Sequence, residues 1–123
     1  MSDIPNKEFT YQIIGSAYNV YNRLGYGYQE KYYQRAFAEE LKKLQIPHQK
    51  EKMIKIKYND RIIGRYFIDF EVANKLAVEL KIGNEFYKKY INQVLAYLKS
   101  SNIKLGLLIM FSKTGIRIKR LIV

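Results

Sequence analysis

The chain has 123 residues, of which 48% are hydrophobic and 27% are charged, so it is long enough for one domain with an apolar core and is not a disordered tail. It has no cysteine and one histidine, His48, which excludes disulfides and thiolate metal sites and argues against a His-rich metal site or a Ser-His-Asp triad. Twenty-two Lys and Arg residues against eleven Asp and Glu residues give a net charge of +11, which favours a polyanionic partner, most commonly nucleic acid.

The charge is unevenly distributed along the chain. Residues 85–123 carry eight basic side chains and a single acidic one, Glu85. An alternative explanation is that the lysines only keep the protein soluble. No apolar run approaches the roughly 18–20 residues of a membrane span, and the N-terminus lacks the layout of a signal peptide. We therefore expect one cytoplasmic domain over residues 1–123, with no membrane contact.

The first two predicted elements are helices. Apolar residues recur every three or four positions and predict a helix over residues 8–24, which Gly25 ends. A second helix is predicted over residues 29–44. Pro47 prevents it from extending further. Its apolar stripe consists of Tyr33, Phe37, Leu41 and Leu44.

Three strands are predicted next. Alternating apolar residues and lysines predict a strand over residues 54–58, and Asn59-Asp60 is a suitable hairpin turn. Residues 61–71 form the partner strand, and a turn over residues 73–75 leads to a third strand over residues 76–82.

Helical periodicity returns over residues 85–101. The nearly continuous apolar run over residues 104–111 is typical of a strand covered on both faces. Residues 116–123 form a last strand, which we expect at a sheet edge where a second copy can pair with it to give a homodimer. The order α-α-β-β-β-α-β-β predicts an α/β (α+β) domain with a mixed central sheet flanked by helices.

Three charged residues interrupt the apolar pattern of the predicted strands. Asp69 lies in an otherwise apolar run, and Glu79 and Lys81 flank Leu80 on the following strand. If these two strands pair antiparallel, Asp69 falls opposite Glu79, and the two carboxylates meet on one face with the ammonium beside them.

Two adjacent carboxylates repel each other unless a cation joins them, and Mg²⁺ or Mn²⁺ suits oxygen ligands of this kind. Such an ion polarises a phosphoryl oxygen and lowers the pKa of a bound water. Lys81 would then orient or deprotonate that water, or stabilise charge on the phosphate. The alternative is a surface salt-bridge cluster, because Glu-x-Lys is a common tripeptide.

Two further features belong to the predicted helices. Glu30 lies three residues before Tyr33, on the core-facing stripe, although an acid in the first turn also suits the helix dipole. Gln93 and Tyr97 are four residues apart and continue a stripe that begins with Phe86 and Tyr90. That stripe is equally consistent with an ordinary amphipathic boundary.

These residues resemble a known family. The segment from Gly27 to Tyr33 fits the Gly-x-x-Glu-x-x-Tyr signature of the GxxExxY proteins, which are placed in the PD-(D/E)XK nuclease superfamily. The resemblance extends from about Ile13 to Ile122 and includes the strand with Asp69 and the Val-Glu-Leu-Lys segment of the next strand. It departs from the strict Pro-Asp pair, because Ile68 precedes Asp69.

The resemblance implies the superfamily's α-β-β-β-α-β core and a role for each residue. Asp69, Glu79 and Lys81 correspond to the motif's two acids and its lysine, and Glu30 resembles the additional acid borne by a helix. Gln93 and Tyr97 resemble the Gln-x-x-x-Tyr motif of the RecB-like branch, where this helix lines the DNA side of the site.

We therefore expect an Mg²⁺-dependent or Mn²⁺-dependent nuclease that hydrolyses phosphodiester bonds, with DNA as the substrate. The expected metal ligands are Glu30, Asp69, Glu79 and the backbone carbonyl of Leu80, and the expected catalytic residues are Asp69, Glu79, Lys81 and Gln93. The groups expected to contact nucleic acid are Tyr97, Lys88, Lys89, Arg117, Lys119 and Arg120. The alternatives are a nucleic-acid-binding module that does not cut and a regulatory subunit of a larger complex.

Overall fold

The computed structural model describes residues 4–123, which form three helices and a five-stranded mixed sheet. The expected order α-α-β-β-β-α-β-β and the α+β class are confirmed. The helices are α1 (Lys7–Leu24), α2 (Glu30–Lys43) and α3 (Lys88–Ser100). The strands are β1 (His48–Tyr58), β2 (Arg61–Val72), β3 (Leu76–Ile82), β4 (Leu105–Ser112) and β5 (Gly115–Ile122). No helix in this part of the chain is long and apolar enough to cross a membrane.

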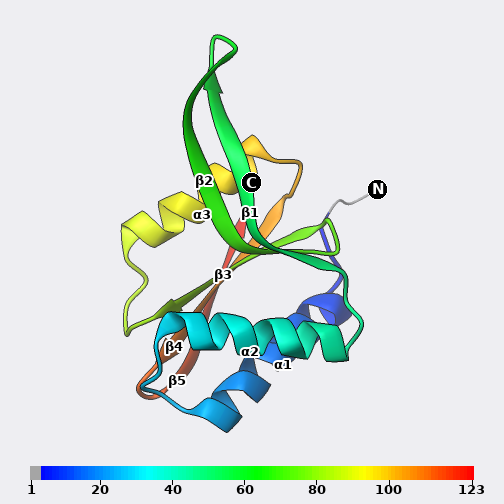
Figure 1. Ribbon diagram of the computed structural model, residues 1–123, viewed down its shortest axis with the longest axis vertical. Coiled ribbons are helices and arrows are strands. Elements are labelled where there is room, and N and C mark those ends of the chain that lie inside the picture. The colour runs from blue at the N-terminus through cyan, green and yellow to red at the C-terminus, as the bar shows by residue number, and fades with distance from the viewer. Residues whose placement is uncertain (1–3) are drawn as a thin grey trace.

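The strand order across the sheet follows the chain, β1-β2-β3-β4-β5, so β1 and β5 are the edge strands. Neighbouring strands are antiparallel except β3 and β4, which are parallel and are joined through α3. The β1–β2 hairpin extends beyond the rest of the molecule (Figure 1).

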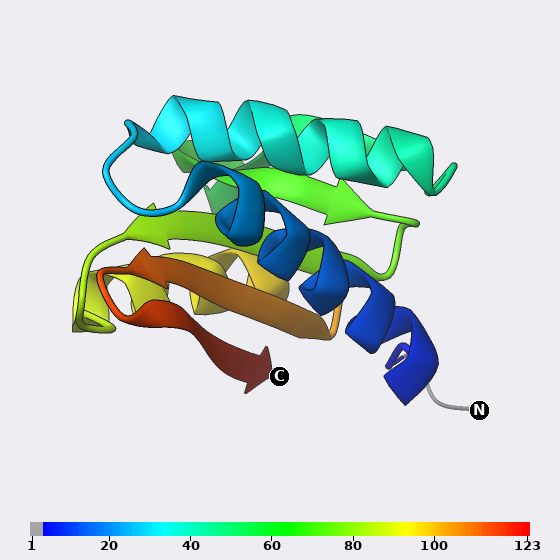
Figure 2. The same ribbon diagram turned by 90° about the horizontal axis from the view of Figure 1, so that it is seen from below.

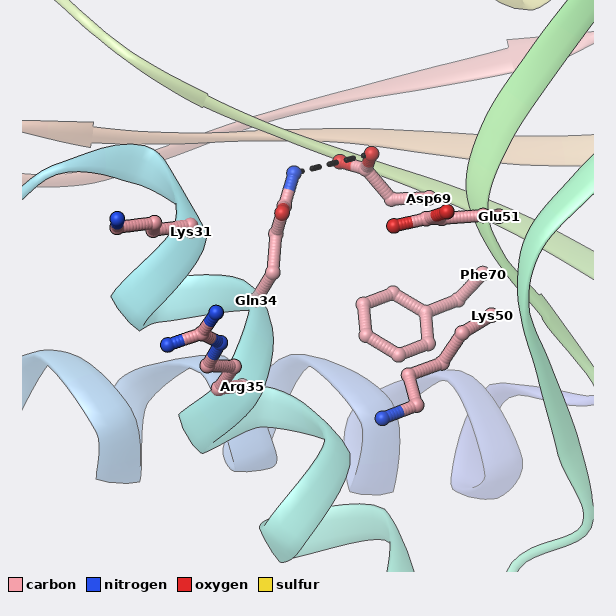
Figure 3. Close-up of a pocket in the computed structure, with 7 residues that line it drawn as sticks. All are labelled: Lys31, Gln34, Arg35, Lys50, Glu51, Asp69 and Phe70. Carbon is pink, nitrogen blue, oxygen red and sulfur yellow. Dashed lines mark hydrogen bonds between the residues drawn. The ribbon is translucent and has the colours of Figure 1, made fainter.

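The helices lie on both faces of the sheet. Figure 2 shows α1 and α2 over one face, with α3 behind the sheet on the other. At the end of the sheet where α2 passes β1, an open pocket lies between the two elements (Figure 3).

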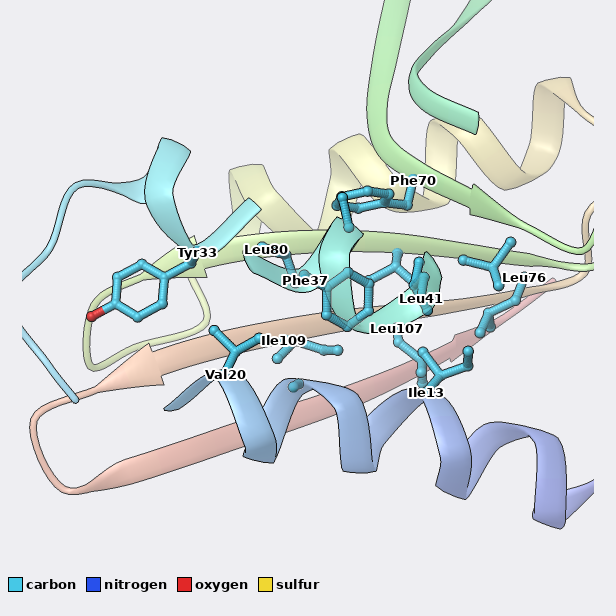
Figure 4. Packing of buried hydrophobic residues seen from close by; sticks show 14 of the residues in the cluster. Ile13, Val20, Tyr33, Phe37, Leu41, Phe70, Leu76, Leu80, Leu107 and Ile109 are labelled. Carbon is cyan, nitrogen blue, oxygen red and sulfur yellow. The ribbon is translucent and has the colours of Figure 1, made fainter. Parts of the chain in front are cut away.

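The larger part of the core lies between the sheet and the first two helices (Figure 4). Tyr33, Phe37 and Leu41 of α2 are fully buried there, as the sequence pattern predicts. Every residue of β4 is buried, which confirms that this strand is covered on both faces. A smaller apolar cluster lies under α3 and includes Ile68, Val94, Tyr97 and Leu98.

Two element boundaries differ from those expected by more than one residue. Helix α3 begins at Lys88 instead of residue 85, because the preceding segment is held against β5: Arg117 donates a hydrogen bond to the Asn84 carbonyl, and its guanidinium lies 5.2 Å from the Phe86 ring centroid. Strand β1 begins at His48, six residues before the expected start at residue 54. Its first half has no alternating pattern and becomes a strand by pairing with the end of β2.

Candidate active site

The candidate site lies where β2 and β3 separate. The two strands are paired only from Phe70–Val72 to Leu76–Val78, and beyond that point β2 continues in the hairpin with β1. Asp69 and Glu79 come directly after the last pair. The backbone N–H of Asp69 donates to Glu79 Oε1 at 2.9 Å, and the backbone N–H of Leu80 donates to Asp69 Oδ2 at 2.8 Å. The expected opposition of Asp69 and Glu79 is confirmed, and each carboxylate is fixed by the backbone of the other strand.

Lys81 lies among the acids. Its Nζ is 3.4 Å from Glu79 Oε2 and 3.9 Å from Glu30 Oε1, and 18% of its side chain is exposed. The same ammonium lies 4.9 Å from the ring centroid of Tyr90 on α3. The ammonium therefore links β3 to the first turn of α2 and to α3.

The loop before α2 accounts for the position of Glu30. Gly27 has a φ of +120°, which favours glycine. The buried Tyr33 donates from its hydroxyl to the Gly25 carbonyl at 2.5 Å, which ties the loop to the helix. Glu30 is the first residue of α2 and is held near Lys81 by this arrangement. The spacing Gly-x-x-Glu-x-x-Tyr thus has a structural reason: the glycine turns the chain, the tyrosine anchors the turn and the glutamate reaches the cluster.

Gln34, one helical turn after Glu30, is a further residue of the cluster that was not predicted from the sequence. Gln34 Nε2 donates to Asp69 Oδ1 at 3.1 Å and lies 3.5 Å from Glu30 Oε1. Its spacing of four residues from Glu30 places both on one face of α2, which is the signal that was available in the sequence.

The electrostatics of the cluster are dominated by burial. Burial, reinforced by the Asp69 carboxylate, raises the pKa of Glu79 to about 7. Burial also raises the pKa of Asp69 and of Glu30. Burial disfavours the Lys81 ammonium, but Glu79, Glu30 and Asp69 together outweigh it and raise the lysine pKa. Three acids surround one ammonium, so the fully ionised cluster has a net negative charge and attracts a further cation.

The donor set suits a hard divalent cation, because its side-chain ligands are all carboxylate oxygens. One oxygen of each β-strand acid is bound by a backbone N–H, and the other oxygen faces Gln34 or Lys81. Over residues 4–123, Asp, Glu and His side chains do not form a close group of three around one point. A metal would therefore take the place of a Gln34 or Lys81 contact.

The structure places Gln93 near the cluster and Tyr97 apart from it. Gln93 Nε2 donates to the Phe67 carbonyl at 3.3 Å, two residues before Asp69 on β2. Tyr97 has no exposed surface, and its hydroxyl donates to Glu71 Oε2 at 2.5 Å. Tyr97 thus lacks the surface that a phosphate contact requires, which contradicts its expected role in binding nucleic acid.

The five basic residues expected to bind nucleic acid are all exposed, on α3 and β5. Lys89 Nζ lies 5.4 Å from the Tyr90 centroid, which places it near Lys81. Arg117 and Lys119 lie over the Phe86 ring. Arg120 lies on the opposite face of β5 from these two, because side chains alternate along a strand. Lys88 opens the first turn of α3.

Comparison with known proteins agrees with this fold. The crystal structure of SSO0001 resembles the chain over 95% of its length and 78% of the other chain, with a TM-score of 0.52 and 10% sequence identity, which shows a shared fold. No curated protein sequence matches the chain. The family model described as the PD-(D/E)XK nuclease superfamily matches residues 7–121. The chain belongs to that superfamily.

Proposed function

We propose that this protein is a nuclease that hydrolyses phosphodiester bonds with the help of Mg²⁺ or Mn²⁺. The observation that carries the proposal is the pair of acids at the β2–β3 fork, each fixed by the opposite backbone, with Lys81 Nζ 3.4 Å from Glu79 Oε2. A salt-bridge cluster at the surface would not explain why Glu79 is 3% exposed and has a raised pKa.

Each residue of the cluster has a separate role in the proposed reaction. Asp69 and Glu79 would hold the cation, joined by Glu30 and the Leu80 backbone carbonyl. When bound, the cation supplies charge stabilisation at a phosphoryl oxygen and a more acidic water. Lys81 would hold the attacking water or the negative charge that develops on the phosphate. Gln34 and the Leu80 N–H keep the Asp69 carboxylate oriented, and Gln93 supports β2 next to it.

DNA is the substrate that we propose. The net charge of +11 favours a polyanion, and exposed Lys88, Lys89, Arg117 and Lys119 lie on α3 and β5 on the side of Lys81 and Tyr90. We further propose that the chain is a GxxExxY protein of the RecB-like branch. The structural role of Gly27, Glu30 and Tyr33 supports the first assignment, and the position of Gln93 supports the second.

The test is cleavage of labelled single-stranded, duplex and branched DNA and of RNA, each with Mg²⁺, Mn²⁺ or EDTA. We expect metal-dependent cutting that falls by about 100-fold or more in Glu79→Gln and in Lys81→Met. Glu85→Gln and Lys113→Met are matched controls, because both residues are exposed and lie outside the cluster. If no substrate is cut and all variants bind nucleic acid equally, the alternative of a binding module or a regulatory subunit replaces this proposal.

A second readout does not depend on activity. Mg²⁺ that binds the folded cluster raises the melting temperature by mass action. We expect this rise in the unmodified protein and in Glu85→Gln, and its loss in Glu79→Gln. An equal rise in the melting temperature of all three proteins would show that Mg²⁺ binds outside the cluster.

A further inference from the structure

The open pocket between α2 and β1 borders the cluster described above and shares Gln34 and Asp69 with it. Its volume is about 360 Å³, within the range of small-ligand pockets. Helix α2 contributes Lys31, Gln34 and Arg35, and Lys50 and Glu51 reach it from β1 (Figure 3). Asp69 lies at its inner end, where the dashed bond to Gln34 marks the border with the cluster.

The pocket carries positive charge that the protein does not neutralise. Lys31, Arg35 and Lys50 are exposed, and none of them forms an ion pair with another residue between positions 4 and 123. Lys31 and Arg35 lie 5.3 and 5.8 Å from the centroid of the Tyr32 ring, which supports both side chains at the rim. Two acids, Asp69 and Glu51, also line the pocket, so the three basic side chains exceed the acids by one.

The position of the pocket limits what it can bind. It shares Gln34 and Asp69 with the candidate active site, so a ligand in the pocket lies next to a phosphate held at the cluster. Lys89 of α3 contacts the same Tyr90 ring as Lys81, whereas the pocket lies between α2 and β1. A nucleic-acid strand with one phosphate at the cluster would have its neighbours near cations on both sides.

We propose that this pocket binds the phosphodiester backbone of the substrate strand beside the bond that is cleaved, through Lys31, Arg35 and Lys50. The inference rests on the proposed function, since it takes the substrate to be nucleic acid. A phosphate is the ligand class favoured by a pocket that has more basic than acidic side chains and no ion pair to hold them. Glu51 opposes such a ligand and sets the affinity below its maximum.

The first experiment measures binding of a labelled oligonucleotide in EDTA, where cleavage does not interfere. The pocket variant combines Lys31→Ala, Arg35→Ala and Lys50→Ala, and the control combines Lys43→Ala, Lys104→Ala and Lys113→Ala. Both remove three exposed positive charges, so the difference between them isolates the pocket. We expect the pocket variant to bind about tenfold more weakly than the control and the slope of log K against log salt to fall by about 1 per lost contact. Equal affinities and slopes would overturn the proposal.

The second experiment tests a substitution that should strengthen nucleic-acid binding instead of weakening it. Glu51→Gln removes the opposing carboxylate without changing its shape, and we expect affinity to rise about twofold or more. Glu39→Gln, an exposed residue on α2, is the control and leaves affinity unchanged. A fall in affinity with Glu51→Gln would count against a phosphate in the pocket.

Failure of this inference is distinguishable from failure of the proposed function. If the protein cuts nucleic acid and the pocket variant keeps the unmodified KM, the pocket assignment is wrong and the nuclease stands. If the pocket variant loses binding but no protein cuts, the backbone site stands and the nuclease does not. Absence of any nucleic-acid binding overturns both.

Discussion

Glu79 is buried to 97%, with one carboxylate oxygen on a backbone N–H and the other facing Lys81. Its pKa is about 7 in the folded protein and 4.5 in an unfolded chain, so the folded state binds the proton more tightly. The free energy of unfolding therefore falls as the pH rises from about 4.5 to about 7, on the order of 1–3 kcal/mol. Asp69 and Glu30 act in the same direction, because burial raises their pKa values too.

The measurement is urea unfolding in EDTA at about pH 5 and about pH 8. We expect Glu79→Gln to lose part of the pH dependence of the unmodified protein, because the amide has no proton to gain. Glu39→Gln on the exposed face of α2 is the control. An unchanged pH dependence in Glu79→Gln would show that its carboxyl titrates at an ordinary pKa.

Tyr97 has a structural role in this fold. Its ring is buried between α3 and the sheet, and this burial, together with the Glu71 carboxylate, raises the pKa of its hydroxyl. We expect Tyr97→Phe to lower the free energy of unfolding by about 1 kcal/mol while nucleic-acid affinity stays unchanged. Urea unfolding and oligonucleotide binding together check this. A weakened affinity at unchanged stability would return Tyr97 to the nucleic-acid interface.

The residue patterns predict the centre of the site better than its surroundings. Strand alternation and a short turn are local features, and they suffice to bring Asp69, Glu79 and Lys81 together. Gln34 and Lys50 were missed, because they come together only where α2 and β1 line the same pocket, and residue spacing does not show how distant elements are placed. Tyr97 shares a helix face with Gln93 in the sequence. Both residues contact β2, but the packing of α3 leaves Gln93 partly exposed and buries Tyr97 completely.

At the scale of elements, Gly106 sets the distance between α3 and the sheet. A Cβ at this position would lie 2.7 Å from Val94 Cγ1 and 3.3 Å from Leu98 Cδ1. We expect Gly106→Ala to lower the free energy of unfolding by about 1–3 kcal/mol, because the β-branched Val94 has little freedom to move. Gly15 in α1 is the matched control, since nothing lies within 4 Å of its Cβ position.

Gly15→Ala should stabilise the protein by up to about 1 kcal/mol, as expected for an open position inside a helix. Urea unfolding of both variants gives opposite signs if the spacing of α3 depends on Gly106. An unchanged free energy of unfolding in Gly106→Ala would show that α3 can move away from the sheet without loss of stability. The sequence does not show that Gly106 is crowded and Gly15 is not, because each glycine simply follows an apolar residue.

The elements themselves were predictable where one local rule acted alone. The apolar stripe and Pro47 predicted the position and the end of α2, and the unbroken apolar run identified β4. The prediction failed where distant partners decide. The segment before α3 has helical spacing but is held by Arg117, and the start of β1 has no alternation but pairs with β2.

At the scale of the whole molecule, the net charge of +11 affects nucleic-acid binding and self-association in opposite ways. Counterion release makes nucleic-acid binding weaker as salt rises. The homodimer that we expect through the edge strand β5 would bring together two copies of Arg117, Lys119 and Arg120. Like charges on paired strands repel, and salt screens that repulsion.

We therefore expect the dimer population, measured by sedimentation velocity, to rise between about 0.05 M and about 0.5 M salt, where the screening length falls several-fold. The variant with Lys119→Gln and Arg120→Gln should dimerise at lower salt, because part of the repulsion is removed. The control with Lys43→Gln and Lys55→Gln makes the same change of charge on α2 and on the opposite edge strand β1, and should behave as the unmodified protein does. A dimer population that falls with salt, or that responds equally to both variants, would place the contact outside the β5 edge.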